Sequence, residues 1–157
     1  MPTGSDGYNF TRLREAILLL STSKQWDSAR LEWRLDHIFE VEEPEECLCG
    51  HFPIIEICVL INKRNGTTAE VGNICVKRFL GIRSDKIFSC IKRIRNNLDK
   101  APNAETIELL FDQDLISSWE RSFSLDTLRK RNLTPGQLQK RHEINEKILA
   151  NIIRART

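Results

Sequence analysis

Four cysteines lie within residues 47–75, and their spacing constrains the fold of this chain more than any other feature. Cys47-Leu-Cys49-Gly-His51 is followed by Val71-Gly-Asn-Ile-Cys75, with Cys58 between them and Cys90 beyond. An odd number of cysteines cannot all pair, and such clustering is typical of a metal site rather than of a disulfide framework. We therefore predict a bound metal ion, the alternative being buried cysteines without a ligand.

Three thiolates come from Cys47, Cys49 and Cys75, whereas a structural zinc site needs four Cys or His ligands. A glycine after the second cysteine supplies the unusual backbone angles of a tight turn. Two residues compete for the fourth position. His51 follows Cys49 on the same turn, whereas Cys58 lies mid-strand, where a free cysteine is commonly a small buried hydrophobe. The predicted Zn²⁺ ligands are Cys47, Cys49, His51 and Cys75, with Cys58 as the alternative fourth ligand.

The same segment carries a wider pattern. Cys47-x-Cys-Gly-His51, Ile61-Asn62, Asn65-Gly66, Val71-Gly-Asn-x-Cys75-Val and Phe79 together resemble a small zinc-ribbon-like module of uncharacterised bacterial, phage and large-virus proteins. The resemblance covers residues 46–80. It implies the ligand set with His51, because the histidine recurs in such modules while a large apolar residue often stands at the position of Cys58. It implies no particular activity.

Helical patterns precede the cysteine segment. Apolar residues recur at helical spacing from Phe10 through Leu13 and Ile17 to Leu20, which predicts a helix from Asn9. After the break at Ser21-Thr-Ser23, Trp26, Ala29 and Trp33 share one face of a second predicted helix that ends near Asp36. A short strand is expected from residue 37.

The pattern of the cysteine segment predicts a β-hairpin, and helical patterns follow it in the sequence. The runs Ile54–Ile61 and Thr67–Val71 flank Asn65-Gly66, a strong hairpin-turn pair. From Ser84 on, apolar stripes predict helices, and Thr134-Pro135 marks the start of the last one. The predicted fold is α+β: a mainly helical single domain, 1–157, with N-terminal helices over 9–36, a zinc-ribbon-like β-hairpin over 37–80 and C-terminal helices over 84–157.

Charge is distributed unevenly along the chain, although the net charge is only +2. Acidic residues gather over 32–46 and basic residues over 77–100 and near the last helix. Clustered Lys and Arg supply the sequence-independent part of nucleic-acid affinity. The predicted nucleic-acid-binding residues are Lys86, Lys92, Arg93, Arg95, Arg129, Lys130, Arg131, Lys140 and Arg141; the alternative is a solvated basic face.

Known catalytic motifs do not occur in the sequence. It contains no HExxH, no phosphate-cradling glycine loop and no Gly-x-Ser-x-Gly elbow, so we expect no enzymatic activity. We see no secretory signal and no apolar run of membrane-spanning length, which favours a cytoplasmic protein.

The predicted function is a non-enzymatic zinc protein that contacts nucleic acid or a nucleic-acid-handling complex, in a phage or mobile-element setting. The alternative is a protein-interaction module or inhibitor that docks on a protein partner through its acidic and basic faces. The oligomeric state is not predicted.

Overall fold

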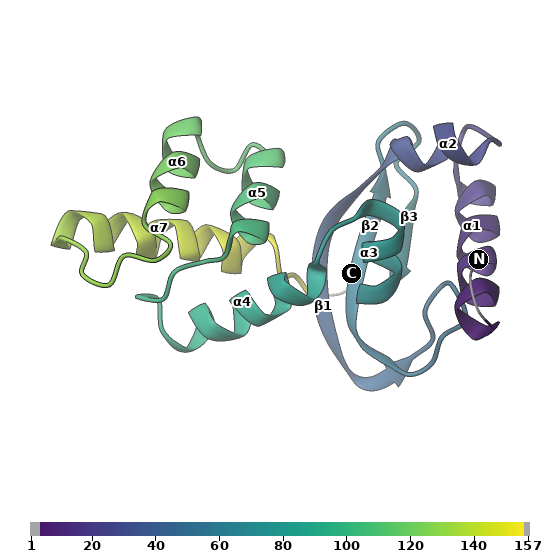
Figure 1. The fold of residues 1–157 in the computed structure, drawn as a ribbon, viewed down its shortest axis with the longest axis horizontal. Coiled ribbons are helices and arrows are strands. Elements are labelled where there is room, and N and C mark those ends of the chain that lie inside the picture. Colours follow the sequence, from purple (N-terminus) through teal and green to yellow (C-terminus); the bar gives the residue numbers. More distant parts are fainter. Residues whose placement is uncertain (1–3, 156–157) are drawn as a thin grey trace. The chain divides into compact units, whose positions relative to one another are not determined.

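A computed structural model describes residues 4–155 and shows a mixed fold of helices and one antiparallel sheet (Figure 1). The chain divides into two compact units, Met1–Ile82 (the N-terminal unit) and Arg83–Thr157 (the C-terminal unit). The mainly helical α+β class is confirmed, whereas the single domain over 1–157 stays a prediction. None of the helices within residues 4–155 combines the length and the apolar character that crossing a bilayer requires.

The N-terminal unit contains all the strands of the described chain. Its elements are α1 (Gly4–Leu20), α2 (Trp26–Ala29), the short 3₁₀ helix η1 (Arg30–Glu32), β1 (Trp33–Glu45), β2 (Ile54–Asn62), β3 (Thr68–Val71) and α3 (Asn73–Leu80). The sheet order is β1-β2-β3, with both pairs antiparallel. The predicted hairpin is present as β2 and β3, and its turn contains Gly66 at φ 75°. The short strand expected from residue 37 is part of a longer strand, β1, which completes the sheet on the other side of β2.

Aromatic side chains pack the three helices of this unit together. The indole of Trp26 in α2 meets Phe10 of α1 edge-on, with ring centroids 6.1 Å apart, and Phe79 of α3 at 5.2 Å. Leu13 and Ile17 of α1 are fully buried, as their helical spacing predicts. Edge-to-face rings contribute beyond their buried area, so this stack holds α1 and α3 near each other.

The predicted second helix is wrong beyond residue 32. Trp33 and Leu35 are buried while Arg34 between them is exposed, which is the alternation of a strand. Trp33 pairs with Asn62, and Leu35 pairs with Leu60 of β2. The helical spacing of Trp26, Ala29 and Trp33 is real, but pairing with β2 supplies backbone partners that a short helix lacks, and the chain becomes β1 instead.

A buried carboxylate marks the point where helix gives way to strand. Glu32, only 2% exposed, accepts hydrogen bonds from the backbone amides of Thr22 and Ser23, at 2.8 and 2.9 Å, and from Nδ2 of Asn62 at 2.9 Å. Burial alone would raise the pKa of this carboxyl, but these donors together lower it to about 2. Oδ1 of Asn62 in turn accepts from the amides of Arg64 and Asn65 in the hairpin turn. One carboxylate therefore ties the α1–α2 turn to the tip of the β2–β3 hairpin.

The C-terminal unit is helical. Its elements are α4 (Ser84–Asn96), α5 (Ala104–Asp112), α6 (Ser118–Asp126) and α7 (Pro135–Asn151). The predicted stripe of α4 is buried at Ile87, Ile91 and Ile94. Thr134 caps α7 in a capping box with Gln137, and Pro135 stands in the first turn, as expected from the N-cap and N1 preferences. Ser84, where the helical pattern begins in the sequence, is the first residue of α4.

We expect Glu32→Gln to lower the thermal unfolding temperature at pH 7 by several degrees. The Glu32 carboxylate accepts hydrogen bonds from three donors. A glutamine side chain has only one oxygen to accept them, and its NH₂ group is itself a donor, so hydrogen bonds are lost. A carboxyl whose folded pKa is depressed stabilises the fold above its unfolded pKa, and this contribution disappears as pH falls from about 4.5 to about 2. The gap between wild type and variant should therefore be full at pH 7 and shrink steadily below pH ~4.5.

Exposed Glu15 of α1 provides the control. Glu15→Gln should leave the unfolding temperature nearly unchanged at pH 7 and also below pH ~4.5. Equal effects of the two substitutions, or a Glu32→Gln gap that does not change with pH, would contradict the role assigned to the buried carboxylate.

Candidate metal centre

A tight turn presents the first two sulfurs. The amide of Gly50 donates to the carbonyl of Cys47 at 2.8 Å, and the amide of Cys47 donates to the carbonyl of His51 at 2.8 Å. Gly50 adopts φ +91°, in the left-handed region that side chains rarely reach. The guanidinium of Arg12 also occupies the space that a side chain at Gly50 would need. Glycine is therefore required here, as the spacing predicts.

The third sulfur comes from a helix start rather than from a hairpin strand. Gly72 is the N-cap of α3 in extended conformation, and Cys75 follows in the first turn of that helix. Gly72 and Asn73 thus form the transition from β3 into α3. Val71 at the end of β3 pairs with Cys58 of β2. The next residue, Gly72, lies against Ile54 at the start of β2, and its amide reaches Cys47 of the 47–51 turn.

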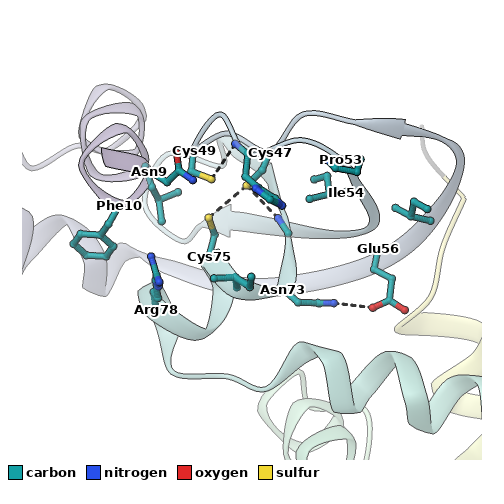
Figure 2. A pocket seen from close by; sticks show the side chains of 15 residues that line it. Asn9, Phe10, Cys47, Cys49, Pro53, Ile54, Glu56, Asn73, Cys75 and Arg78 are labelled. Atoms are coloured by element: carbon teal, nitrogen blue, oxygen red, sulfur yellow. Dashed lines mark hydrogen bonds between the residues drawn. The ribbon is translucent and has the colours of Figure 1, made fainter. Parts of the chain in front are cut away.

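Figure 2 shows the three sulfur atoms converging. The Sγ atoms of Cys47, Cys49 and Cys75 all lie within 4.8 Å of one another, and those of Cys47 and Cys75 are 3.4 Å apart. The three residues are 3%, 3% and 7% exposed, and none forms a disulfide. Backbone amides point at the cluster: that of His51 donates to Cys49 Sγ at 3.4 Å, and that of Gly72 donates to Cys47 Sγ at 3.3 Å.

These contacts separate the acidities of the three thiols. The hydrogen bond between Cys47 and Cys75 holds the pKa of the Cys47 thiol well below its usual range, and backbone amides act in the same direction. The same bond raises the pKa of the Cys75 thiol, and the neighbouring charge of Cys47 acts in the same direction. Burial raises the pKa of Cys49. Three thiolates can coexist at this spacing only if a cation neutralises them.

The donor set fits a thiophilic metal ion. With Zn–S bonds of about 2.3 Å, sulfurs at the corners of a tetrahedron stand about 3.8 Å apart, close to the separations seen here. Soft thiolates favour Zn²⁺, Cu⁺ or iron–sulfur clusters over hard cations such as Mg²⁺. The three cysteines could therefore hold a thiophilic metal ion with little rearrangement.

Among residues 4–155, only the three cysteines converge as donors, and neither candidate for the fourth ligand lies with them. Cys58 is buried on β2, and its thiol donates to Oδ1 of Asn73 at 3.4 Å. His51 has an exposed side chain on the metal turn. Cys90 lies in α4, in the other unit.

A pocket adjoins the sulfurs within the N-terminal unit. Its volume is about 540 Å³, and it is lined by parts of α1, the turn of residues 47–51, the start of β2 and the start of α3. All three clustered cysteines contribute to its wall, together with His51. Sequence analysis missed this pocket, because its walls come from four separate segments and no local pattern records their convergence.

The basic residues expected to contact nucleic acid differ in their exposure and in the groups that they contact. Lys92, Arg95, Arg129, Lys130 and Arg131 are exposed. Lys86 pairs with Glu105 at 3.4 Å, and Arg93 donates to the carbonyl of Ala101 at 2.7 Å. Lys140 is half-buried and pairs with Glu143 at 3.0 Å and Glu120 at 3.7 Å.

Arg141 corrects the sequence interpretation. It is 6% exposed, and its guanidinium donates to the carbonyls of Thr127 at 2.7 Å and Asp99 at 3.1 Å. Burial lowers its pKa. The signal was present in the sequence, because Arg141 precedes buried Ile144 and Ile148 by three and seven residues and so shares their helix face. Arg141 supports the fold of the C-terminal unit and is not available to a phosphate.

Arg141→Gln should therefore destabilise the protein by roughly 1–3 kcal/mol, since a buried hydrogen bond to Thr127 and a part-buried one to Asp99 are lost. A shift of the urea midpoint with an unchanged slope would report this loss. Arg131→Gln, at an exposed arginine, should change stability by no more than about 0.5 kcal/mol. Equal midpoints for the two variants would show that Arg141 is not a structural residue.

Comparisons of the chain with protein-family models, with curated proteins and with solved structures give no match. The resemblance of residues 46–80 to zinc-ribbon-like modules stays a prediction.

Proposed function

We propose that the chain is a zinc-binding protein whose ion joins the 47–51 turn to the start of α3. The observation that carries this proposal is the convergence of three buried sulfurs, two of which also accept a backbone amide. Zinc is the metal commonly held by closed Cys/His sets in structural sites. In such sites the free energy of metal binding is folding free energy, so the ion stabilises this end of the sheet.

His51 is the proposed fourth ligand. Its backbone already takes part in the metal turn, through its amide to Cys49 Sγ and its carbonyl to the amide of Cys47. Its exposed side chain is free to rotate about two torsions and lines the same pocket as the sulfurs. Cys58, by contrast, is committed to a hydrogen bond with Asn73 on the packed face of β2.

Purified protein should contain about one zinc ion per chain, since the site offers one tetrahedral set. Cys49→Ser and Cys75→Ser should lose the ion and the cooperative unfolding transition. Zinc content by plasma mass spectrometry and circular dichroism on the same samples test both statements. Soluble, folded wild-type protein without zinc contradicts the proposal.

The identity of the fourth ligand has its own pair of variants. His51→Ala should weaken zinc binding in a chelator competition while the protein remains folded. Cys58→Val, which keeps a buried side chain of similar size, should retain a zinc content near that of wild type. The reverse pattern would make Cys58 the ligand and His51 a surface residue.

We further propose that the protein contacts nucleic acid through residues 129–131. Arg129, Lys130 and Arg131 are consecutive and exposed in the segment between α6 and α7, and none of the three forms an ion pair within residues 4–155. Lys130 has only a long hydrogen bond to Gln137, at 3.4 Å. Three unpaired cations on one short segment are suited to bind phosphates, which releases counterions. This segment supports the proposal better than α4, where Lys86 and Arg93 already have partners.

Reversal of Arg129, Lys130 and Arg131 to Glu should abolish binding to mixed-sequence DNA and RNA in a gel-shift assay at low salt. Wild-type affinity should fall steeply between about 50 and 200 mM salt, with little dependence on base sequence. A matched control reverses Lys63, Arg64 and Lys77, three exposed cations of the other unit, and changes the net charge equally. This control should bind as wild type does.

Absence of binding by wild-type protein at 50 mM salt would overturn the nucleic-acid proposal and leave the zinc proposal untouched. Residues 129–131 would then be the first candidates for a protein-docking surface. Loss of binding in both triple variants would mean that only net charge matters, which also contradicts a specific phosphate-binding segment.

A further inference from the structure

An exposed tryptophan lies in the same unit as the proposed phosphate-binding residues. Trp119, the second residue of α6, is 63% exposed. Among residues 83–155, it is the only large apolar side chain that is exposed to this degree. Single apolar residues on a protein surface are common, so the surroundings of this indole decide whether it can bind a ligand.

The indole of Trp119 is held in place by two neighbours. Phe123, one turn further along α6, stacks on it with ring centroids 5.5 Å apart and an interplanar angle of 12°. Lys140 of α7 places its Nζ atom 5.8 Å from the centroid of the indole. Aromatic rings make both kinds of contact favourably. The ring is therefore ordered before a ligand arrives, while more than half of the residue's surface stays open to solvent.

Side-chain contacts connect this ring to the exposed cations between α6 and α7. Lys130 donates to Oε1 of Gln137 at 3.4 Å. Gln137 and Lys140 are three residues apart on α7, where such side chains are neighbours on the helix surface. Lys140 in turn contacts the indole of Trp119. Trp119 and residues 129–131 thus lie near each other on the surface of the C-terminal unit.

The C-terminal unit is also the basic part of the chain. Residues 83–157 contain 15 Lys or Arg and 10 Asp or Glu, a net charge of +5, whereas residues 1–82 contain 9 and 12, a net charge of −3. Lys140 itself is paired with Glu120 and Glu143. The cations available to a ligand near the ring are therefore those of residues 129–131, on a unit whose net charge attracts polyanions.

An exposed ring beside cations matches the chemistry of an unpaired nucleotide. Proteins that bind single strands combine cations for the phosphates with aromatic rings on which the bases stack. A base within a duplex is already stacked between its neighbours, so its faces are closed to an indole. A protein partner would favour further exposed apolar side chains around the ring, and Trp119 has no such large neighbour among residues 83–155.

We infer that the protein binds single-stranded nucleic acid, with one base stacked on Trp119 and phosphates of the same strand at Arg129, Lys130 and Arg131. The inference rests on the proposed nucleic-acid contact and specifies its substrate class, an unpaired segment rather than a duplex. Single-stranded DNA and single-stranded RNA both offer this chemistry. Stacking tolerates any base, which agrees with a weak dependence on base sequence.

Binding titrations of the full, zinc-loaded chain test the inference. The probes are labelled mixed-sequence single strands of about 12 nucleotides, one of DNA and one of RNA, and a DNA duplex of the same length. Trp119→Ala should weaken binding to the single strands about tenfold or more, as expected for a lost base stack. It should change the affinity for the duplex by less than about twofold. The single strand that wild-type protein binds more tightly identifies the source, DNA or RNA.

Tyr8→Ala is the matched control. Tyr8 of α1 is 62% exposed and also has a cation near its ring, Arg12 at 5.7 Å, but it belongs to the acidic unit. Its substitution should leave all three affinities within about twofold of wild type. Trp119→Phe keeps a ring beside Phe123 and should retain more single-strand binding than Trp119→Ala. Circular dichroism on each variant confirms that the protein remains folded.

Two further measurements separate stacking from charge. Stacking releases no counterions, so Trp119→Ala should leave the slope of log affinity against log salt concentration unchanged, whereas Arg131→Gln should reduce it by about one. An indole stacked on a base loses fluorescence. The single strands should therefore quench the fluorescence of wild-type protein, and this quenching should be absent from Trp119→Phe.

The outcomes distinguish this inference from the proposed function on which it rests. Wild-type protein that binds none of the three probes at about 50 mM salt overturns both. If Trp119→Ala weakens single-strand and duplex binding equally, or weakens neither, the stacking inference is overturned and the contact through residues 129–131 stands. Equal losses in Trp119→Ala and Tyr8→Ala also overturn it, because any exposed ring then has the same effect.

Discussion

The sulfur of Cys47 connects two segments that are far apart in the sequence. It lies 3.4 Å from the sulfur of Cys75 and accepts the amide of Gly72, so the turn before β2 is joined to the start of α3 after β3. The β2–β3 hairpin is the stretch of chain between these two points. Closing that loop costs chain entropy. Three buried thiols without a cation contribute little to offset this entropic cost. The proposed zinc ion therefore stabilises the contact on which the site and its pocket depend.

The N-terminal unit is closed at its other end by a different chemistry. There the Glu32 carboxylate and the Asn62 amide satisfy the backbone of two turns, at the tip of the hairpin and after α1. Buried Phe39, Ile57 and Val59 pack together on the sheet between the two ends. A polar network that satisfies all its members costs little and confers a unique structure. The carboxylate end thus has a structural role, and the open volume at the sulfur end is where a ligand can bind.

Much of the fold could be predicted because local signals agreed with the tertiary structure. Asn65-Gly66 required a hairpin, and the α4 stripe and the Thr134-Pro135 start required helices. The clustering of Cys47, Cys49 and Cys75 was also predictable, because two short motifs with glycine flank a hairpin that brings its ends together. Spacing alone left His51 and Cys58 as alternatives for the fourth ligand, because neither short motif places a fourth donor among the three sulfurs.

Other features escaped prediction for physical reasons. Residues 26–35 satisfy both a helical and a strand pattern, and only pairing with β2 selects the strand from Trp33. Arg141 was taken as a surface cation because of its charge, although its helix position placed it among buried isoleucines. The pocket could not be foreseen, because its walls come together only when α1, the metal turn, β2 and α3 are folded.

X-ray absorption at the zinc edge of protein purified without added metal reports the ligands of the ion. A zinc ion held by Cys47, Cys49, Cys75 and His51 should give three sulfur scatterers at about 2.3 Å and one nitrogen at about 2.0–2.1 Å. A zinc ion surrounded only by nitrogen and oxygen, or folded protein that gives no zinc signal, would contradict this assignment.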